Sequence, residues 1–274
     1  AGPLGRMTVT DDHLRRALAD DGVDLVLADN PSPMTLDGTN SYVLRSQDGA
    51  SALLLDPGPM LVEHRDALLR TVGSAQLAAI VLTHRHADHS GLLETVGEWA
   101  PGAPVHAVDP TFASGAAPLQ DGDRIAFGTH DEDAVSIVAT PGHTDDFVSA
   151  VHGSRLFAGD TVLGRGTTMV SFPDGSLGDY LDSLERLTAL EAAGTITTIA
   201  PAHGEQREDV GELLAHYLSH RRERIGQVQD VLASGRTTAE AVAEVVYADV
   251  PDSVKPAALQ IVRAQLAYIA TLED

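Results

Sequence analysis

Cysteine is absent from the sequence of 274 residues. Neither a disulfide framework nor a thiolate metal site is therefore available, and any bound metal has to be held by nitrogen and oxygen atoms. A chain without cysteine also favours a reducing compartment. Long hydrophobic runs are missing too, since no stretch reaches the length of a membrane span and the first residues lack the pattern of a signal peptide. These absences predict a cytoplasmic protein that makes no contact with a membrane.

Positive charge is also scarce. Lys and Arg together number 18 against 40 Asp and Glu, the net charge is −22, and Lys255 is the only lysine. Such an excess of negative charge repels polyanions at long range unless a local basic patch overcomes it. The composition therefore disfavours RNA as a partner without excluding it.

The length suits one large domain or one domain with an appendage. Residues 1–6, Ala-Gly-Pro-Leu-Gly-Arg, resemble the remnant of a protease-cleaved expression tag, and we expect Met7 to be the native start. This hexapeptide is left out of the reasoning about the fold.

Short apolar runs alternate with turn residues and amphipathic stretches from about Asp24 to Gly204. Runs of this kind predict strands, and apolar residues spaced by three and four predict helices. The predicted strands are 25–27, 41–44, 52–55, 78–82, 105–108, 135–139, 147–151, 155–158 and 195–199, and the predicted helices are 62–71, 91–99 and 177–192. We therefore expect an α/β fold in which helices cover sheets.

The pattern becomes wholly helical after this region. Residues 208–233, 237–247 and 253–272 predict three helices, and Thr237 and Glu240 have the spacing of a capping box. We therefore place one domain at residues 7–206 and a helical C-terminal domain at residues 207–274. From its position alone, the helical domain is expected to mediate dimerisation or to close a pocket.

Three histidines and one aspartate fall within six residues, His84-Arg85-His86-Ala87-Asp88-His89, directly after an apolar strand. Such a density of nitrogen and oxygen donors at a strand end predicts a metal site. Donors adjacent in sequence cannot all reach one ion, because alternate residues in an extended turn point to different sides. Two metal ions are the economical solution.

Three further donors follow later strands. His143 can join His84 and His86 on one ion, and His203 can join Asp88 and His89 on the other. Asp160 can bridge both ions through its two oxygens. This ligand set leaves open positions for water, as in catalytic zinc sites, and two divalent cations acidify such a water to a nucleophilic hydroxide.

Asp56 follows another strand and precedes Pro57-Gly58. We expect its carboxylate to accept a hydrogen bond from a ligand imidazole and so to orient it. The alternative is an aspartate that only forms a turn.

The complete set of donors resembles that of the metallo-β-lactamase-fold hydrolases, whose motifs match Asp56, the segment His84–His89, His143, Asp160 and His203 in order. Within that superfamily, the segment Asn30–Asn40 and the helical tail resemble the β-lactamase-like-protein-2 group, which includes an endoribonuclease. The resemblance implies a four-layer αββα sandwich with a dinuclear site at one edge and a small winged-helix-like C-terminal domain.

Two positions separate the chain from relatives with other chemistry. His86 stands where diiron oxygen- and nitric-oxide-reducing relatives have glutamate, so the resemblance implies zinc hydrolysis rather than redox chemistry. Asp160 stands where many true β-lactamases have cysteine or no bridging residue. We therefore expect two divalent ions, zinc before iron or manganese, and no preference for antibiotics.

The predicted activity is a metal-dependent hydrolase in which a metal-bound hydroxide attacks an ester, thioester or related acyl bond of a small molecule. A metal-dependent single-strand endoribonuclease is the alternative, and a β-lactamase is the third choice. A homodimer is a further expectation. A non-enzymatic protein with structural metals is disfavoured by the open positions in the ligand set.

Two other segments leave alternatives open. Arg221-Arg222-Glu223-Arg224 could bind phosphate or form a solvated charged helix face, and we favour the charged face. Met169 and Phe172, which follow Asp160, could wall a substrate pocket or pack in the core.

Overall fold

The protein is described from a computed structural model, which covers residues 22–170 and 172–272. The predicted tag remnant and the expected start at Met7 lie outside these residues. The chain forms two compact units. The first contains the described residues up to Ser136 together with Ala202–Gln206, and the second contains Ile137–Pro201 and the residues from Arg207 onward.

The first unit contains a five-stranded mixed sheet in the order β1-β2-β3-β4-β5. The strands are β1 (Val23–Leu27), β2 (Asn40–Arg45), β3 (Ser51–Leu55), β4 (Gln76–Val81) and β5 (Val105–His106). β1, β2 and β3 pair antiparallel, whereas β3, β4 and β5 pair parallel. Parallel pairing needs a crossover, and α2 (Val62–Val72) makes the crossover from β3 to β4.

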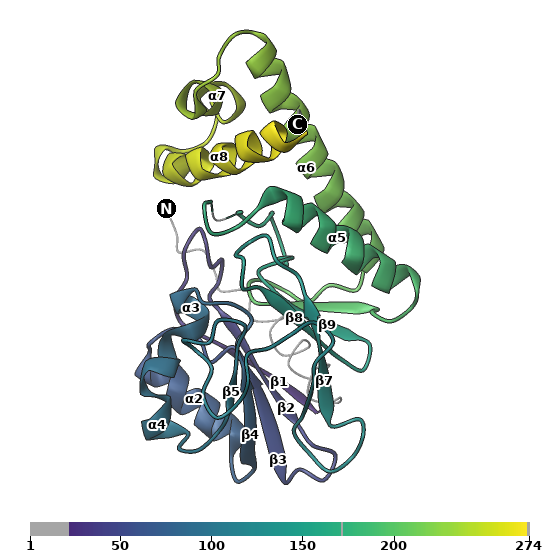
Figure 1. Cartoon of the computed structure of the whole chain (residues 1–274). Helices are drawn as coiled ribbons and strands as arrows, with labels where there is room; N and C mark the ends of the chain where they lie inside the picture. Colours follow the sequence, from purple (N-terminus) through teal and green to yellow (C-terminus); the bar gives the residue numbers. More distant parts are fainter. Residues whose placement is uncertain (1–21, 171, 273–274) are drawn as a thin grey trace, which may run out of the picture. The chain divides into compact units, whose positions relative to one another are not determined.

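Short helices follow β4 in this unit. They are α3 (Ala87–Ser90), the 3₁₀ helix η1 (Gly91–Thr95) and α4 (Val96–Trp99), and Figure 1 shows α2, α3 and α4 beside the sheet. Leu68 of α2 and Leu92 of η1 pack with Leu54 and Ile80 of the sheet, and all four side chains are buried. The nearly continuous apolar character of β3 and β4 follows from this burial.

A second sheet has the order β10-β9-β8-β7-β6. Its strands are β6 (Arg124–Ala126), β7 (Ala134–Ala139), β8 (Val148–His152), β9 (Arg155–Gly159) and β10 (Thr198–Pro201). β6 and the first half of β7 belong to the first unit, and the rest belongs to the second. β10 pairs parallel with β9, and α5 (Leu177–Ala192) makes the crossover between them.

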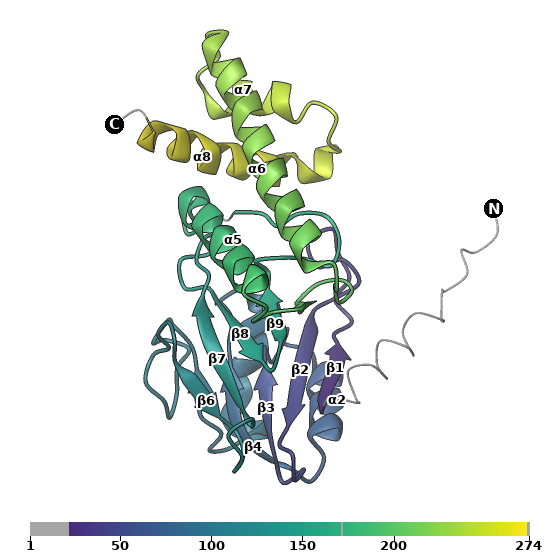
Figure 2. The ribbon, with the colours of Figure 1, turned by 90° about the vertical axis from the view of Figure 1, so that its right-hand side faces the viewer.

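The C-terminal region is helical, as predicted. It contains α6 (Val210–Ala233), α7 (Ala239–Val246), the 3₁₀ helix η2 (Asp252–Val254) and α8 (Lys255–Thr271). Figure 2 shows α6 running past both α5 and α8. Leu184 of α5, Tyr217 and Val228 of α6, and Val262 of α8 share one hydrophobic core with Leu156 of β9. The helical region is therefore continuous with the second sheet.

Several predicted elements differ in detail. The predicted helix 91–99 is a 3₁₀ helix followed by one short α-helical turn, and β6 was not predicted. The last predicted strand lies about three residues too early, at 195–199 rather than Thr198–Pro201. The cap of α7 is Thr238 instead of Thr237, because the Thr238 side chain accepts the Ala241 backbone N–H at 3.2 Å.

The sequence favoured a solvated charged helix face for residues 221–224, and this interpretation was wrong for Arg221. Its side chain is buried in the second unit with only 3% exposed, whereas that of Arg222 is 64% exposed. The predicted boundary between residues 206 and 207 and the winged-helix likeness stay predictions. Within residues 22–170 and 172–272, no helix is long and apolar enough to cross a membrane.

Candidate metal centre

The parallel pairing of β3 and β4 places Asp56 and the donors between His84 and His89 at one sheet edge. Leu55 and Val81 are register partners at the ends of these strands, and the Asp56 backbone N–H donates to the Val81 carbonyl at 2.9 Å. Asp56 and the segment after β4 therefore leave the sheet together, as the carboxyl ends of parallel strands do.

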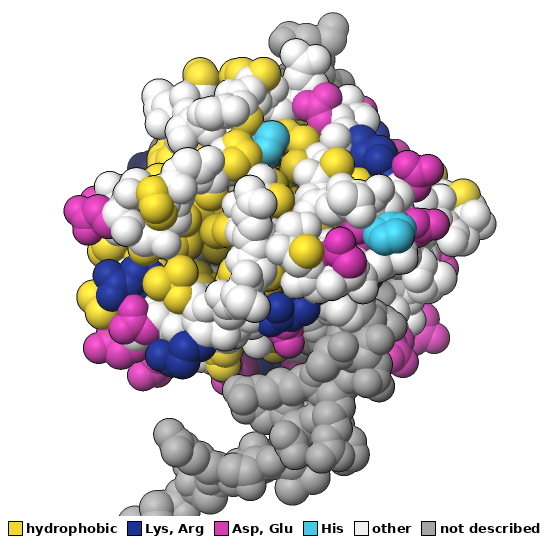
Figure 3. Space-filling view, turned by 90° about the horizontal axis from the view of Figure 1, so that it is seen from below, with side chains coloured by type: hydrophobic (Ala, Val, Ile, Leu, Met, Phe, Trp, Pro, Cys, Tyr) yellow, Lys and Arg dark blue, Asp and Glu magenta, His cyan; other side chains and the backbone are white. Residues whose placement is uncertain are grey.

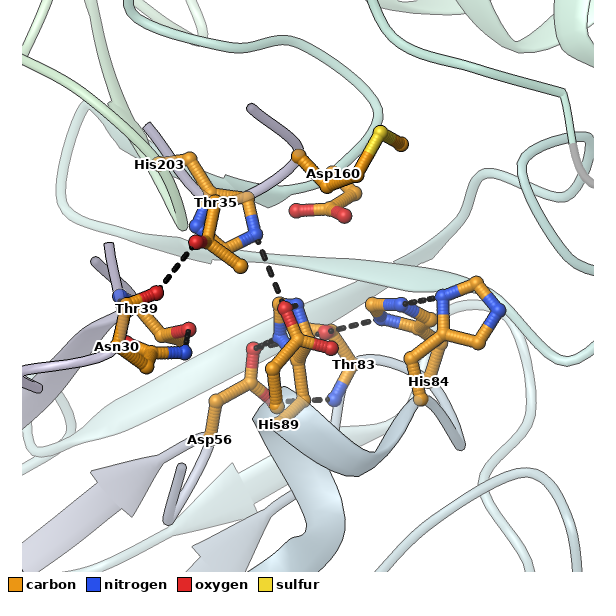
Figure 4. A network of polar contacts seen from close by, with 12 residues as sticks. Asn30, Thr35, Thr39, Asp56, Thr83, His84, His89, Asp160 and His203 are labelled. Carbon is orange, nitrogen blue, oxygen red and sulfur yellow. Dashed lines mark hydrogen bonds and ion pairs between the residues drawn. The ribbon is translucent and has the colours of Figure 1, made fainter. Parts of the chain in front are cut away.

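Asp56 orients two imidazoles. One carboxylate oxygen accepts the Thr83 backbone N–H at 2.7 Å, and the other accepts the Thr83 hydroxyl at 2.8 Å and Nδ1 of His89 at 2.8 Å. Since the Thr83 hydroxyl donates to Asp56, its oxygen can accept Nδ1–H of His84 at 3.1 Å. Asp56 thus holds His89 directly and His84 through Thr83, as Figure 4 shows. Its backbone has a φ of +51°, which is a strained conformation for a non-glycine residue.

Asp88, His89 and His203 converge in the first unit. Asp88 and His89 lie on the helical turn α3, instead of the extended turn that we expected, and His203 follows β10. Oδ2 of Asp88 lies 3.5 Å from Nε2 of His89 and 3.3 Å from Nε2 of His203. Each of the three side chains offers a donor atom within 4.8 Å of the other two. Both histidines are buried, and the Asp88 side chain is 28% exposed.

His84 and His86 form a second pair of donors in the same unit. Nε2 of His84 lies 3.0 Å from Nδ1 of His86, and their ring centroids are 4.6 Å apart. His84 is buried, whereas His86 is partly exposed. Two ring nitrogens at this distance can both serve as ligands of one ion.

His143 and Asp160 come together in the second unit. His143 follows β7, Asp160 follows β9, and Nε2 of His143 lies 3.5 Å from Oδ2 of Asp160. Nδ1 of His143 donates to the Met169 carbonyl at 2.5 Å. The turn before His143 requires glycine, because Gly142 has a φ of +135° and an added Cβ would lie 2.3 Å from Cα of Tyr180.

A rigid loop supports His203. Nδ1 of His203 donates to the Gly38 carbonyl at 3.0 Å. The loop is closed by reciprocal hydrogen bonds of Asn30 with Thr39, both at 2.9 Å (Figure 4). Gly38 has a φ of +139°, and an added Cβ would lie 2.0 Å from the Ala28 carbonyl oxygen. The loop therefore presents the Gly38 carbonyl in a fixed direction.

Asn40, at the start of β2, fastens the backbone around His203. Its backbone N–H donates to the Ala202 carbonyl at 2.7 Å, and its side-chain amide donates to the Gly204 carbonyl at 2.9 Å. Thr83, Gly38 and Asn40 were given no roles by sequence reasoning. The segment Asn30–Asn40 was noted only as a family resemblance. The signal in the sequence that could have pointed to these roles is Gly38 followed by the polar residues Thr39 and Asn40.

His64, to which the sequence assigned no role, lies behind the Asp56 turn. Its Nε2 lies 2.9 Å from the Ser41 hydroxyl, and the side chain is buried. Burial lowers the pKa of His64 to about 4, so the ring is neutral near pH 7. An added Cβ on Gly58 would lie 2.6 Å from this nitrogen, so the ring packs closely against the turn.

A cavity of the first unit lies at the other ends of the strands. Its volume is about 320 Å³, and its lining includes Val72 at the end of α2, Gln76 at the start of β4, and Trp99 and Pro104 before β5. Figure 3 shows hydrophobic side chains gathered around a hollow on the face seen from below. Since the donors follow the carboxyl ends of β3 and β4, this cavity is separate from the candidate metal centre.

The donors and the fold define a hydrolase class. The model of the Metallo-beta-lactamase superfamily matches residues 34–203, which is more than half of the chain, and the chain belongs to that superfamily. Members of the superfamily are metal-dependent hydrolases, so the protein is an enzyme of this class. The predicted fold is thereby confirmed.

Individual relatives agree with this assignment. The chain is similar to the β-lactamase-like protein 2 homolog of Caenorhabditis elegans, with 34% identity over 258 residues that cover 90% of this chain and 83% of the relative. It also resembles the structure of the metallo-β-lactamase family protein TTHA1429 from Thermus thermophilus, with a TM-score of 0.75, 20% identity and coverage of 92% and 94%. A structure of TTHA1623 in a di-iron-bound form matches with a TM-score of 0.53, 25% identity and coverage of 68% and 96%.

Proposed function

We propose that the protein is a dinuclear-metal hydrolase, with zinc as its metal, that cleaves an ester, thioester or related acyl bond of a small molecule. The observation that carries the proposal is the arrangement of His89 and His203 around Asp88. Both histidines donate Nδ1–H to a fixed acceptor, so Nε2 of each ring is the nitrogen that faces the Asp88 carboxylate. A metal-binding histidine typically donates its other ring N–H to such an acceptor, which fixes the orientation of the ring.

In this proposal, His84, His86 and His143 would hold one ion, Asp88, His89 and His203 would hold a second, and Asp160 would be a ligand shared by both.

The fit of a metal to the donors of the first unit is good. Four imidazoles and one carboxylate are available there, and nitrogen with oxygen donors suits zinc, while also accepting iron. The di-iron-bound form of TTHA1623 makes iron the principal competitor. We favour zinc because His86 supplies a nitrogen ligand in place of the carboxylate typical of diiron relatives.

The residues of the chain have distinct tasks in this reaction. Bound divalent ions would acidify a water molecule and polarise the acyl oxygen. Asp88 is the partly exposed member of its group, so its carboxylate would be the group there that can accept a proton during hydrolysis. Asp56, Thr83 and the Gly38 carbonyl keep the imidazoles from rotating. No side-chain nucleophile is required.

The charge of the chain supports a small-molecule substrate over RNA. With a net charge of −22, association with a polyanion would be opposed at long range. A cytoplasmic location and a homodimer belong to the same proposal and rest on composition and on the C-terminal helices.

The test combines metal analysis of the pure protein with three substrates: an acyl thioester, a chromogenic β-lactam and labelled single-stranded RNA. We expect two zinc ions per chain and hydrolysis of the thioester. Asp88→Ala should abolish the activity, whereas Asp66→Ala, on the exposed surface of α2, should retain it. Metal-dependent cleavage of the RNA alone would replace the acyl assignment with the phosphodiester one, and activity that survives in Asp88→Ala would refute the proposed centre.

A further inference from the structure

The segment from Asp160 to Val170 follows β9 without forming a helix or strand. Much of it is nevertheless buried, with Thr161, Val162 and Thr168 exposing 3% of their surface or less. Buried backbone groups outside secondary structure need hydrogen-bond partners from elsewhere. In this segment α5 and α6 supply several of the partners.

Three side chains of these helices bind the segment. The Tyr180 hydroxyl of α5 donates to the Thr161 carbonyl at 2.7 Å, and the Tyr217 hydroxyl of α6 accepts the Leu163 backbone N–H at 2.9 Å. The Arg221 guanidinium donates to the Thr168 carbonyl and lies over the Tyr180 ring, 5.0 Å from its centroid. Burial raises the pKa of both tyrosines, so their hydroxyls remain protonated.

The segment in turn contacts both donors of the second unit. The Thr168 hydroxyl donates to the backbone carbonyl of Asp160. Met169 is the residue after Thr168, and its carbonyl accepts Nδ1–H of His143 at 2.5 Å. Arg221 therefore holds a peptide carbonyl that is adjacent in the chain to the one that orients His143.

The chemistry of Arg221 is unusual for a core residue. Its side chain is 3% exposed, no carboxylate of the described residues forms an ion pair with it, and its Nε has no hydrogen-bond partner there. Burying a cation without an acidic partner is unfavourable, and an apolar side chain of similar length would fill the same volume without that penalty. The planar guanidinium provides what an apolar residue lacks, namely a donor to Thr168 and a flat face against Tyr180.

We propose that Arg221, together with Tyr180 and Tyr217, is a positioning residue through which α5 and α6 hold Asp160 and His143 in the geometry that binds metal. The inference rests on the proposed function, since it takes Asp160 and His143 as ligands. It gives the helical region a task in the metal centre of its own chain.

The test compares Arg221→Met with Arg222→Met in the full chain. The two residues are adjacent on α6, but Arg222 is exposed and pairs with Glu185 at 3.0 Å. Zinc affinity is measured by competition with a chelator, ligand geometry by the absorption spectrum of the cobalt-substituted protein, and folding by thermal unfolding without metal. We expect Arg221→Met to weaken the affinity for at least one ion by about 10- to 100-fold and to change the cobalt spectrum, as loss of a group that orients ligands does.

Arg222→Met should leave the zinc affinity and the cobalt spectrum as they are in the wild type. Arg221→Lys keeps a donor for the Thr168 carbonyl and should recover part of the lost affinity. Wild-type affinity and an unchanged cobalt spectrum in Arg221→Met would overturn the proposal. If that variant does not fold, Tyr180→Phe decides the matter, because it removes only the hydroxyl that donates to the Thr161 carbonyl, next to Asp160. Unchanged metal binding in Tyr180→Phe would then overturn the proposal.

Asp160→Ala separates this inference from the proposed function. If the wild-type protein binds no metal, or if Asp160→Ala binds it with undiminished affinity, the proposed centre itself is wrong. If Asp160→Ala loses metal and Arg221→Met does not, the centre stands and only the positioning role of Arg221 is refuted.

Discussion

The two units hold their donors in different ways. In the first unit, Asp56 and Thr83 lie within a few residues of strand ends and orient His84 and His89 through side chains at the same sheet edge. In the second unit, Arg221 binds a loop that is more than fifty residues away in sequence, and the Met169 carbonyl of that loop orients His143. The donors of the compact motif are oriented by residues close to them in sequence. His143 is oriented by a loop that helices distant in sequence hold in place.

The largest effect is expected from replacing the glycines beside the donors. Gly38→Ala in the first unit and Gly142→Ala in the second would each place Cβ within 2.3 Å of a backbone atom, at a φ unsuited to alanine. Each should lower the free energy of unfolding by more than about 3 kcal/mol. Gly49→Ala, where φ is +69° and nothing lies within 4 Å, should cost only about 1 to 2 kcal/mol. Denaturant unfolding measures all three, and equal losses would contradict the steric argument.

The next effect concerns acid stability of the first unit. The pKa of His64 is lowered to about 4 in the folded protein, against about 6.5 in an unfolded chain. Between these values only the unfolded state binds the proton, so stability falls as the pH falls from 6.5 to 4, by about 3 kcal/mol in all. Unfolding of the metal-free protein over this pH range should be less acid-sensitive in His64→Gln. His216→Gln, on the exposed surface of α6, should show the same change of unfolding free energy with pH as the wild type. If His64→Gln also shows the wild-type change, His64 is not the source of the acid sensitivity.

Asp56→Asn tests the local support of the first unit. An amide cannot accept all of the hydrogen bonds that Thr83 and His89 donate, so both imidazoles lose their orientation. Zinc affinity should fall by about 10- to 100-fold, as chelator competition would measure. Asp66→Asn is the control, because this residue of α2 has a side chain that is 45% exposed and lies outside the donor set. If the affinity is unchanged in Asp56→Asn, the carboxylate only forms the turn.

The smallest effect is expected at a helix end remote from the donors. Thr238→Ala removes the side chain that caps α7 and should lower the free energy of unfolding by about 1 kcal/mol. Metal affinity should not change, because the contacts of α5 and α6 with the 160–170 segment remain. A loss of metal binding in this variant would show that any destabilisation of the helical region disturbs the centre, which would weaken the specific role of Arg221.

Much of the fold was predictable because burial leaves periodic patterns. The apolar runs at β3 and β4 and the three- and four-residue spacing of α5 are local, and α5 was predicted with its observed bounds. β6 was missed because its three residues are largely exposed and carry no apolar pattern. The helix predicted over 91–99 is irregular. It begins as the 3₁₀ helix η1 directly after α3, which carries Asp88 and His89.

The class of chemistry could be inferred from the sequence, because a cluster of imidazoles and carboxylates after a strand has few uses other than binding metal. The order of the strands and helices could also be inferred to a good approximation. The atoms that orient those donors became visible only in three dimensions. Gly38 offers a carbonyl, Thr83 relays a hydrogen bond, and Arg221 is buried rather than solvated. Such roles depend on distance and direction between residues far apart in the chain, which neither composition nor periodicity records.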